Sequence, residues 1–341
     1  MTLRTIALDH INDAEAAALL VGGRLEDLLI DSDQPRPGTI YRAIADRPVK
    51  GQGGMFLRTP DGSAFLRQIK GLTPGQPLLV QVTGHAEPGK ALPVTTRLLF
   101  KSRYAIVTPD APGLNVSRSI KDEALRDSLL EIAHAEMGDS PMGLILRSSC
   151  ESAEAADITE DINAMRDLAE AVLADATGPE PETLTEGDGP HTLAWRDWVE
   201  PADVVTDPGS FAENGVLDQL DALREALVPL PGGASFYIEP TRALVAVDVN
   251  TGGDASLAAG LKANIAMARD LPRQLRLRGL GGQITLDLAP MPKKDRRTFE
   301  ASLRAALRQD TTETTLAGWT PLGHFELQRK RDRQPLTDLL K

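Results

Sequence analysis

The sequence is poor in cysteine, in aromatic residues and in long apolar runs. Its 341 residues include a single cysteine, Cys150, so one chain can form neither a disulfide framework nor a zinc site built from several thiolates. No stretch approaches the roughly 18 consecutive apolar residues of a transmembrane helix. Asp9 and Asp13 occur where a signal peptide would have a basic start and an apolar run. We therefore expect a cytoplasmic protein with no membrane partner, in which any metal ion is held by oxygen or histidine ligands.

Charge is distributed unevenly along the chain. The formal net charge is -12. From residue 262 onward, however, 16 Lys and Arg outnumber 9 Asp and Glu, whereas residues 1–261 contain 21 Lys and Arg and 40 Asp and Glu. A basic segment on an acidic chain favours a polyanion site confined to one face. Solvated arginines on a helical surface would give the same composition.

Turn residues and apolar periodicity divide the chain into segments. The opening runs TLRTIAL and AALLVGGRLEDLLID predict strands, the second split by a hairpin at Gly22-Gly23. Five short apolar runs between Gly and Pro turns over 38–99 predict a small barrel of the OB type. An alternation of strand and helix over 100–175 predicts a compact α/β unit. Residues 176–212 lack periodicity and are expected to form a poorly ordered linker.

The segment after residue 226 contains two apolar strands that end in carboxylates. RALVAVDVN places Asp248 and Asn250 on one face of a strand, because they are two residues apart, and QITLDLA places Asp287 at the end of another. The order of strands and helices predicts a mixed sheet. If these strands are neighbours, the side chains converge at the carboxyl edge, and their oxygen ligands suit Mg²⁺ or Mn²⁺. An aspartate closing a strand is also a common turn residue, so both interpretations remain open at this point.

Basic residues follow the helix predicted over 256–278. Arg276 and Arg278 lie in its last turns, and more Lys and Arg follow at 293–297 and 329–333. Carboxylates ringed by guanidinium groups suit phosphodiester hydrolysis, although arginine near a helix C-terminus also complements the helix dipole. The chain has no GxxxxGK[ST], HExxH, GxSxG or CxxC motif, and its five histidines are scattered, which argues against zinc or an imidazole base.

Two phenylalanines lie on successive strands of the predicted barrel. These are Phe56 and Phe65, and Lys90 precedes the last strand. Aromatic side chains of an OB barrel can stack on the bases of single-stranded nucleic acid. Phenylalanine in a small barrel is more often part of the core.

Three ordered segments resemble the catalytic region of the bacterial ribonuclease E/G family: GGASFYIEPTRALVAVDVNTGG, KANIAMARDLPRQLRLRGLGGQITLDLAPM and GHFELQRKRDRQPL. Upstream, GRLEDLLID, the barrel, RYAIVTPDAPGLNVSRSI and MGLILRSS follow the family's order, so the resemblance covers nearly the whole chain apart from about 176–212.

The resemblance implies an α+β multidomain fold. An OB-fold RNA-binding domain (38–99) would be inserted in a ribonuclease H-like segment (1–37, with a reduced part and linker over 176–225). A 5′-sensor α/β unit (100–175) and a deoxyribonuclease I-like catalytic subdomain (226–341) would complete the chain.

The resemblance also implies roles for individual residues. Asp248 and Asp287 match the aspartates that bind Mg²⁺, and Asn250 matches an asparagine that positions the reacting groups. Arg147 and Ser148 match an Arg-Thr pair that grips a 5′-monophosphate. The implied RNA-binding residues are Phe56, Phe65, Lys90, Arg118, Arg147, Ser148, Arg276 and Arg278.

Some positions depart from the family's pattern. Glu313 stands where the family has a further sensor arginine, so we expect little dependence on a 5′-monophosphate. The loop between Asn250 and Asn264 is shorter than the family's. The CPxCxG segment is absent from the sequence, so we expect no zinc, and an oligomer, if one forms, would not be zinc-linked.

We therefore expect a Mg²⁺-dependent endoribonuclease that cleaves single-stranded RNA in RNA processing or decay. The alternative is a catalytically weak RNA-binding paralogue acting in RNA regulation or rRNA processing. The shortened loop, Glu313 and Pro272, which is expected to kink the helix leading to RQLRLR, favour the alternative. The retained carboxylate pair argues against it. An enzyme acting on a small phosphate ester would leave the barrel unexplained.

Overall fold

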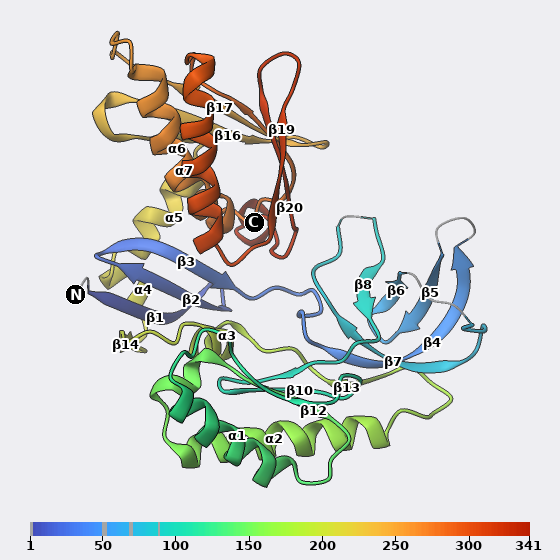
Figure 1. Ribbon diagram of the computed structural model, residues 1–341. Coiled ribbons are helices and arrows are strands. Elements are labelled where there is room, and N and C mark those ends of the chain that lie inside the picture. Colours follow the sequence, from blue (N-terminus) through green and yellow to red (C-terminus); the bar gives the residue numbers. More distant parts are fainter. Residues whose placement is uncertain (1–2, 50–52, 68–70, 88) are drawn as a thin grey trace. The chain divides into compact units, whose positions relative to one another are not determined.

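The chain folds into two compact units in a computed structural model that describes residues 3–49, 53–67, 71–87 and 89–341 (Figure 1). The split unit consists of Met1–Asp31 and Ala202–Lys341, and the inserted unit consists of Ser32–Pro201. Thr2, which begins the predicted strand TLRTIAL, and residues 50–52, 68–70 and 88, which fall within the predicted barrel, lie outside the described residues.

A closed five-stranded barrel opens the inserted unit, so the prediction of an OB-type barrel is confirmed. The strands pair in the order β4-β5-β6-β8-β7, and pairing between β4 and β7 closes the barrel. Strands β6 and β8 are parallel. The interior holds the buried side chains of Tyr41, Leu57 and Val80. The strands are β4 (Ile40–Val49), β5 (Gly54–Thr59), β6 (Gly62–Leu66), β7 (Pro77–Val82) and β8 (Leu92–Thr95).

A four-stranded sheet with two helices follows the barrel, in the alternating order predicted for 100–175. The sheet has the order β11-β12-β10-β9. Helix α1 begins after Asp122, whose side chain accepts a hydrogen bond from the Leu125 N–H, a normal N-cap. The elements are β9 (Phe100–Lys101), β10 (Ala105–Thr108), β11 (Leu114–Val116), α1 (Glu123–Met137), β12 (Gly143–Leu146), the 3-10 helix η1 (Ser148–Ser152) and α2 (Ala155–Ala174).

The segment 176–212 is not the unstructured linker that its composition predicted. It contains β13 (Glu182–Thr185), α3 (Pro190–Asp197), β14 (Asp203–Val205) and α4 (Ser210–Glu213). Strand β13 pairs with β4 of the barrel, and β14 adds a parallel edge strand to β1. The prediction was wrong because partners distant in sequence fix these strands, while the segment's own periodicity is weak.

The split unit begins with an antiparallel sheet of β1 (Arg4–Ile11), β2 (Ala14–Val21) and β3 (Arg24–Ile30), in the order β14-β1-β2-β3. The predicted hairpin at Gly22-Gly23 is present, with both residues at positive φ. A second hairpin at Asn12 and Asp13, also at positive φ, was missed. Helix α5 (Val216–Arg224) packs its buried side chains into the core of this sheet.

A six-stranded mixed sheet completes the split unit, as predicted. Its order is β15-β16-β17-β18-β20-β19, and β17 and β18 form its parallel pair. Helix α6 connects these two strands and continues through Pro272. The elements are β15 (Leu227–Pro229), the 3-10 helix η2 (Pro231–Gly233), β16 (Ser235–Pro240), β17 (Val245–Asn250), α6 (Ala259–Leu277), β18 (Gly282–Asp287), the 3-10 helix η3 (Lys293–Asp295), α7 (Arg296–Gln309), β19 (Thr314–Trp319), β20 (Phe325–Arg329) and α8 (Leu336–Leu339).

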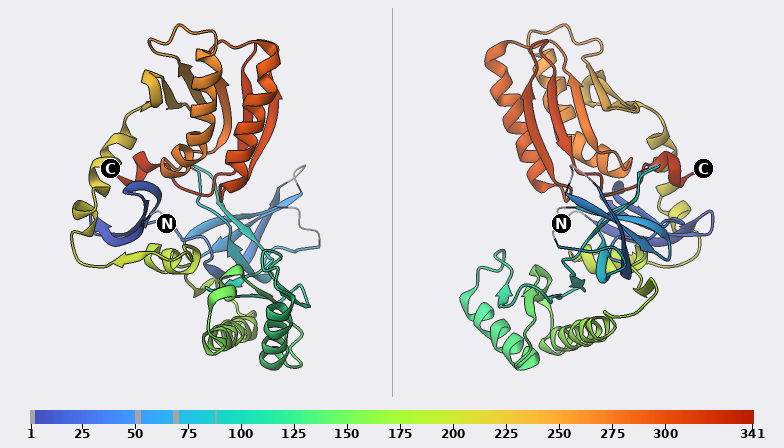
Figure 2. Two further views of the ribbon diagram at one scale, coloured as in Figure 1. Left: turned by 60° about the vertical axis from the view of Figure 1, so that its left-hand side comes forward. Right: turned by 90° about the vertical axis from the view of Figure 1, so that its right-hand side faces the viewer.

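Helices α6 and α7 cover one face of this sheet (Figures 1 and 2). The alternating apolar residues of β17 and β18, such as Val247 and Leu286, are buried beneath the helices. Asp248 and Asp287 point to the opposite face and are exposed. We call this opposite side the open face. No helix in the described part of the chain has the length and apolar character needed to cross a membrane.

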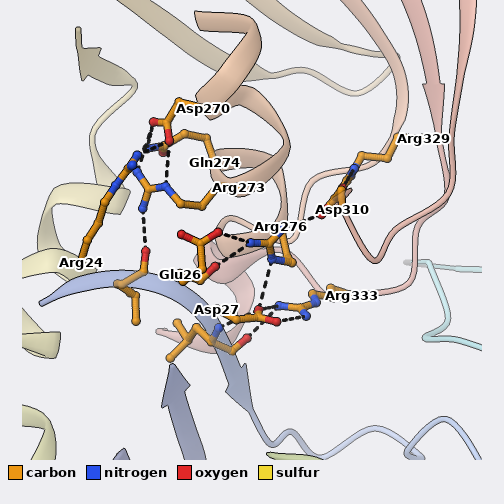
Figure 3. Close-up of polar contacts among 12 residues, drawn as sticks. Arg24, Glu26, Asp27, Asp270, Arg273, Gln274, Arg276, Asp310, Arg329 and Arg333 are labelled. Carbon is orange, nitrogen blue, oxygen red and sulfur yellow. Dashed lines mark hydrogen bonds and ion pairs between the residues drawn. The ribbon is translucent and has the colours of Figure 1, made fainter. Parts of the chain in front are cut away.

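A cluster of ion pairs joins the two sheets of the split unit (Figure 3). Asp310 binds Arg276 of α6 and Arg329 of β20, with 2.5 Å between Arg329 Nη1 and Asp310 Oδ2, and the side chains of Arg329 and Asp310 are each 1% exposed. Asp27 of β3 binds Arg333 at 2.5 Å and lies 3.5 Å from Arg276 Nε. Arg276 therefore links carboxylates of both sheets.

Replacing Asp310 with asparagine should destabilise the split unit strongly. Two buried guanidinium groups would lose their common carboxylate, and such a loss typically costs about 3–5 kcal/mol. The measurement is the midpoint of urea unfolding. Asp338→Asn, which disrupts the exposed Asp338–Lys341 pair, is the matched control and should change stability by less than about 1 kcal/mol. Equal midpoints for the two variants would contradict the role of the cluster.

Acid should weaken the cluster through Asp27. Burial alone would raise the pKa of Asp27, but the charge and hydrogen bonds of Arg333, with Arg276 and the Leu28 N–H, hold that pKa below its ordinary value of 3.8. The resulting stabilisation is complete above the ordinary pKa and is lost as the pH falls through the lower pKa of the folded state.

Asp27→Asn should therefore be less stable than the parent at about pH 6 and should lose less stability on acidification to about pH 3. Urea midpoints at the two pH values measure this. Parallel losses in both proteins would show that Asp27 does not carry the effect.

Candidate active site

Asp248 and Asp287 lie side by side on the open face. They are register partners in the parallel pair of β17 and β18, whose strands are about 4.8 Å apart. Both side chains are exposed at the carboxyl ends of their strands. The sequence-based expectation that these strands are neighbours is therefore met, and the two carboxylates face the same solvent region.

Asn250 contacts the carboxylate pair directly. It lies two residues after Asp248 on the same face of β17, and its Nδ2 donates a hydrogen bond of 2.8 Å to Asp248 Oδ2. This bond restricts rotation of the Asp248 carboxylate and leaves its other oxygen available. The structure thus brings together the three residues expected at the catalytic position.

Tight packing fixes the loop that follows Asp287. Asn264 of α6 is fully buried, donating from Nδ2 to the Ala289 carbonyl at 2.9 Å and accepting from the Ala289 N–H at 3.0 Å. A Cβ at Gly260 would lie 1.9 Å from the Pro290 carbonyl oxygen, so only glycine allows this approach of helix and loop. The start of α6 therefore holds the backbone immediately beyond Asp287.

A second glycine fixes the loop after Asn250. Gly252 has φ +61, and a Cβ there would lie 2.1 Å from the Gly233 carbonyl oxygen. The turn that precedes β16 and the turn that follows β17 therefore touch through their backbones. Both strand ends that carry the candidate residues are anchored in this way.

Two ring side chains flank the carboxylates and were missed in the sequence. Tyr237 of β16 is the register partner of Asp248, and His324 Nε2 lies 3.7 Å from Asp287 Oδ1. The alternation in SFYIEP, with Tyr237 between two buried residues, was a usable signal for an exposed tyrosine. His324 gave no such signal, because only the strand order places β20 beside β18.

Arg276 and Arg278 do not surround the carboxylates, which corrects the expectation that guanidinium groups ring the pair. Arg278 is 8% exposed, and its guanidinium donates to the carbonyls of Leu223 and Glu225. Arg329 shares Asp310 with Arg276. In the sheet, Arg329 is the register partner of Gly282, the first residue of β18, whereas Asp287 is the last residue of that strand. These arginines stabilise the opposite end of the sheet.

Burial also changes the acidity of Arg278. Burial, together with the nearby positive charge of Arg273, lowers the pKa of Arg278 below its ordinary value.

Two exposed lysines lie closer in sequence to the carboxylate pair. They are Lys293 and Lys294 of η3, which follow the loop that leaves β18 after Asp287.

Phe56 and Phe65 form a pair on the barrel. They are cross-strand partners with ring centroids 5.3 Å apart, and the Arg47 guanidinium lies 5.0 Å from the centroid of Phe56. A Cβ at Gly54 would lie 2.4 Å from the Phe65 ring, so glycine makes room for this ring. Both phenylalanines are only partly buried.

A depression of about 470 Å³ lies beside this pair. Arg47, Phe56 and Lys90 are among the residues that line it. Lys90 also forms an exposed ion pair with Glu87, with 2.8 Å between Nζ and Oε2. The barrel therefore presents an aromatic ring and two cations together, and the RNA-binding role of Phe56 and Lys90 stays a prediction.

Arg118 and Arg147 lie at one edge of the second sheet of the inserted unit. They follow β11 and β12, which are parallel neighbours, and Arg118 and Ser148 are exposed. Arg147 is already engaged: Nη1 donates to the Ser102 carbonyl at 2.6 Å and Nη2 binds Asp197 Oδ1 at 2.7 Å. Burial would raise the pKa of Asp197, but hydrogen bonds and charge from Arg196 and Arg147 lower it.

The carboxylate pair fits a hydrated divalent cation better than it fits zinc. Among the described residues, no three His, Cys, Asp or Glu side chains are grouped to hold a metal ion. Mg²⁺ commonly takes one or two carboxylates and keeps several water ligands, a requirement that two exposed neighbouring aspartates meet. A closed zinc site would need more protein ligands.

The fold and site define an α+β protein that joins an OB-type barrel to a sheet with paired aspartates on its open face. The chain belongs to the ribonuclease E/G family: the model of the Ribonuclease E/G family matches residues 100–207 and 203–332. The resemblance that the sequence motifs indicated is therefore confirmed.

Relatives of the chain carry the names of both enzymes. It is 28% identical to ribonuclease E of Nostoc sp. and 28% identical to ribonuclease G of Salmonella typhimurium, in each case over 95% of this chain. It spans 56% of the former and 79% of the latter. It is 26% identical to ribonuclease E of Escherichia coli over 76% of this chain and 28% of that protein.

Proposed function

We propose that this protein is a Mg²⁺-dependent endoribonuclease that cleaves single-stranded RNA in RNA processing or decay. The observation that carries the proposal is the register pairing of Asp248 with Asp287 beside Asn250 on the open face. Membership in a family whose named relatives are ribonucleases E and G supports the same reaction.

Asp248 and Asp287 would hold the metal ion through their carboxylate oxygens, and Mn²⁺ could replace Mg²⁺ there because both prefer oxygen ligands. When bound, Mg²⁺ supplies Lewis-acid stabilisation of the charge that develops on the phosphodiester. Asn250 keeps Asp248 oriented through its 2.8 Å hydrogen bond. Lys293 and Lys294 supply positive charge for RNA phosphates, a role that the buried Arg276 and Arg278 cannot fill.

The barrel provides binding rather than chemistry. Phe56 stacks on a base, while Arg47 and Lys90 lie beside it to pair with the phosphate backbone. Phe65 supports Phe56 from the neighbouring strand. Because every base has a π face, such a surface binds single-stranded RNA with little sequence preference.

Replacing either aspartate of the pair should abolish cleavage. Asp248→Asn and Asp287→Asn remove a metal ligand but also a negative charge that faces phosphate, so RNA affinity should stay equal or rise. Cleavage of a fluorescent AU-rich single-stranded RNA, with Mg²⁺ and with EDTA, measures activity, and fluorescence anisotropy measures binding. Asp338→Asn is the control with the same change of charge at the exposed Lys341 pair.

Metal-dependent cleavage that only the site variants lose supports the proposal. Salt-sensitive binding without cleavage in the parent protein would instead favour the alternative, an RNA-binding paralogue with weak catalysis. Undiminished cleavage by Asp248→Asn would refute the assignment of the site.

Removing the ring of Phe56 should weaken RNA binding. Loss of one stacked base costs about 1–3 kcal/mol, so Phe56→Ala should raise the dissociation constant at least several-fold. Phe56→Tyr keeps the ring and should bind like the parent. Anisotropy titrations at two salt concentrations measure the change, and equal affinities for Phe56→Ala and Phe56→Tyr would contradict stacking.

A 5′-monophosphate should contribute little to cleavage. Arg147 already pairs with Asp197, and Glu313 is an exposed carboxylate where a sensor arginine was expected from the family pattern. Matched RNAs with a 5′-monophosphate and with a 5′-hydroxyl should be cut at rates within about tenfold, a difference of about 1.4 kcal/mol. A hundredfold preference for the monophosphate would overturn this expectation.

A further inference from the structure

Beyond the carboxylate pair, the open face carries two ring side chains in the same row. We propose that Tyr237 and His324 stack on the bases on the two sides of the cleaved phosphodiester and so hold the RNA across the carboxylate pair. This inference rests on the proposed endoribonuclease function. It concerns substrate contacts that neither the carboxylates nor the barrel provide.

The four residues form a continuous row across four neighbouring strands. Tyr237 of β16 is the register partner of Asp248 of β17, which is in turn the partner of Asp287 of β18. His324 directly precedes β20, and its Nε2 lies 3.7 Å from Asp287 Oδ1. At about 4.8 Å per strand, the row extends roughly 14 Å, with the carboxylates in the middle and one ring at each end.

The Tyr237 side chain is not part of the hydrophobic core of the sheet. Its neighbours Phe236 and Ile238 are 0% and 2% exposed beneath the helices, whereas Tyr237 is 39% exposed on the open face. Tyr237 therefore lies outside the apolar core that the helices cover. A ring left in solvent beside the carboxylate pair is available to a ligand.

A tight turn fixes His324 at the other end of the row. Its N–H donates to Thr320 Oγ1 at 3.1 Å, and its carbonyl accepts from the Thr320 N–H at 2.8 Å. Gly323, with φ +96, completes the turn. The His324 side chain is 36% exposed. The turn therefore fixes the backbone from which the His324 ring extends toward Asp287.

Charge explains why rings suit this position. The two carboxylates repel phosphates, and the arginines expected to surround them lie at the opposite end of the sheet. Contacts with the bases therefore add to the attraction that Lys293 and Lys294 provide for the phosphates. Stacking supplies such contacts, because an aromatic face can bind any base through its π face.

The first test compares variants that remove or keep each ring. Tyr237→Ala and His324→Ala should lower kcat/KM for a single-site RNA about tenfold to a hundredfold, mostly through KM, because stacking contributes binding. Tyr237→Phe and His324→Phe keep a ring and should restore most of the loss. If His324 acted only through Asp287, His324→Phe would be as impaired as His324→Ala, which would overturn its part of the proposal.

A second arm removes the base instead of the ring. Substrates with one abasic residue on either side of the cleaved bond should slow the parent protein, and Tyr237→Ala should add no further loss at the position that Tyr237 contacts. Independent effects of ring and base at both positions would overturn the stacking assignment. A change in fold would impair all substrates equally and is thereby recognised.

A third arm does not depend on cleavage. RNA carrying 4-thiouridine beside the cleavage site should crosslink to the peptides containing Tyr237 or His324 in the Asp248→Asn protein, which is expected to bind RNA without cleaving it. Crosslinks with no cleavage by the parent protein would refute the proposed nuclease activity while supporting the contacts. Cleavage with crosslinks confined to the barrel would support the nuclease and refute the contacts.

Discussion

The parallel pairing of β17 with β18 is the constraint on which the candidate active site depends. Parallel neighbours need a long crossover, which α6 provides, and this connection makes both strands end at the same edge of the sheet. The register of the two strands determines which face of the sheet the aspartate side chains occupy. A shift of one residue in either strand would turn Asp248 or Asp287 toward the helices. The buried alternation of Val247 and Leu286 prevents such a shift, so hydrophobic burial on one face positions the carboxylates on the other.

The basic C-terminal segment shows why composition alone does not locate a phosphate-binding surface. Arg276 and Arg329 share Asp310, and Arg278 donates to backbone carbonyls, so these guanidinium groups are engaged within the fold. Removing a charge from water is costly unless partners are present, and the partners come from β3, α6 and the turn that carries Asp310. The arginines therefore join the two sheets of the split unit and do not form an exposed basic surface.

Local pattern predicted those parts of the fold that local burial determines. Apolar runs identified β17, β18 and α6, and the strand ends identified Asp248 and Asp287 before any geometry was known. The strands within 176–212 were not predicted, because they form by pairing with β1 and β4, which are distant in sequence. The position of His324 beside the candidate site was missed for a related reason. Its proximity to Asp287 depends on β20 lying beside β18, and a single sequence does not specify strand order.

The two candidate RNA surfaces combine rings and charge in opposite ways. On the barrel, Phe56 lies beside the cations Arg47 and Lys90, a surface that attracts a phosphate backbone directly. On the open face, Tyr237 and His324 lie beside two carboxylates, which repel a phosphodiester unless their negative charge is offset. The inserted unit is therefore suited to affinity and the split unit to chemistry. Rings on the open face offer contacts with bases there, while the carboxylate oxygens supply ligands of the kind that a divalent cation prefers.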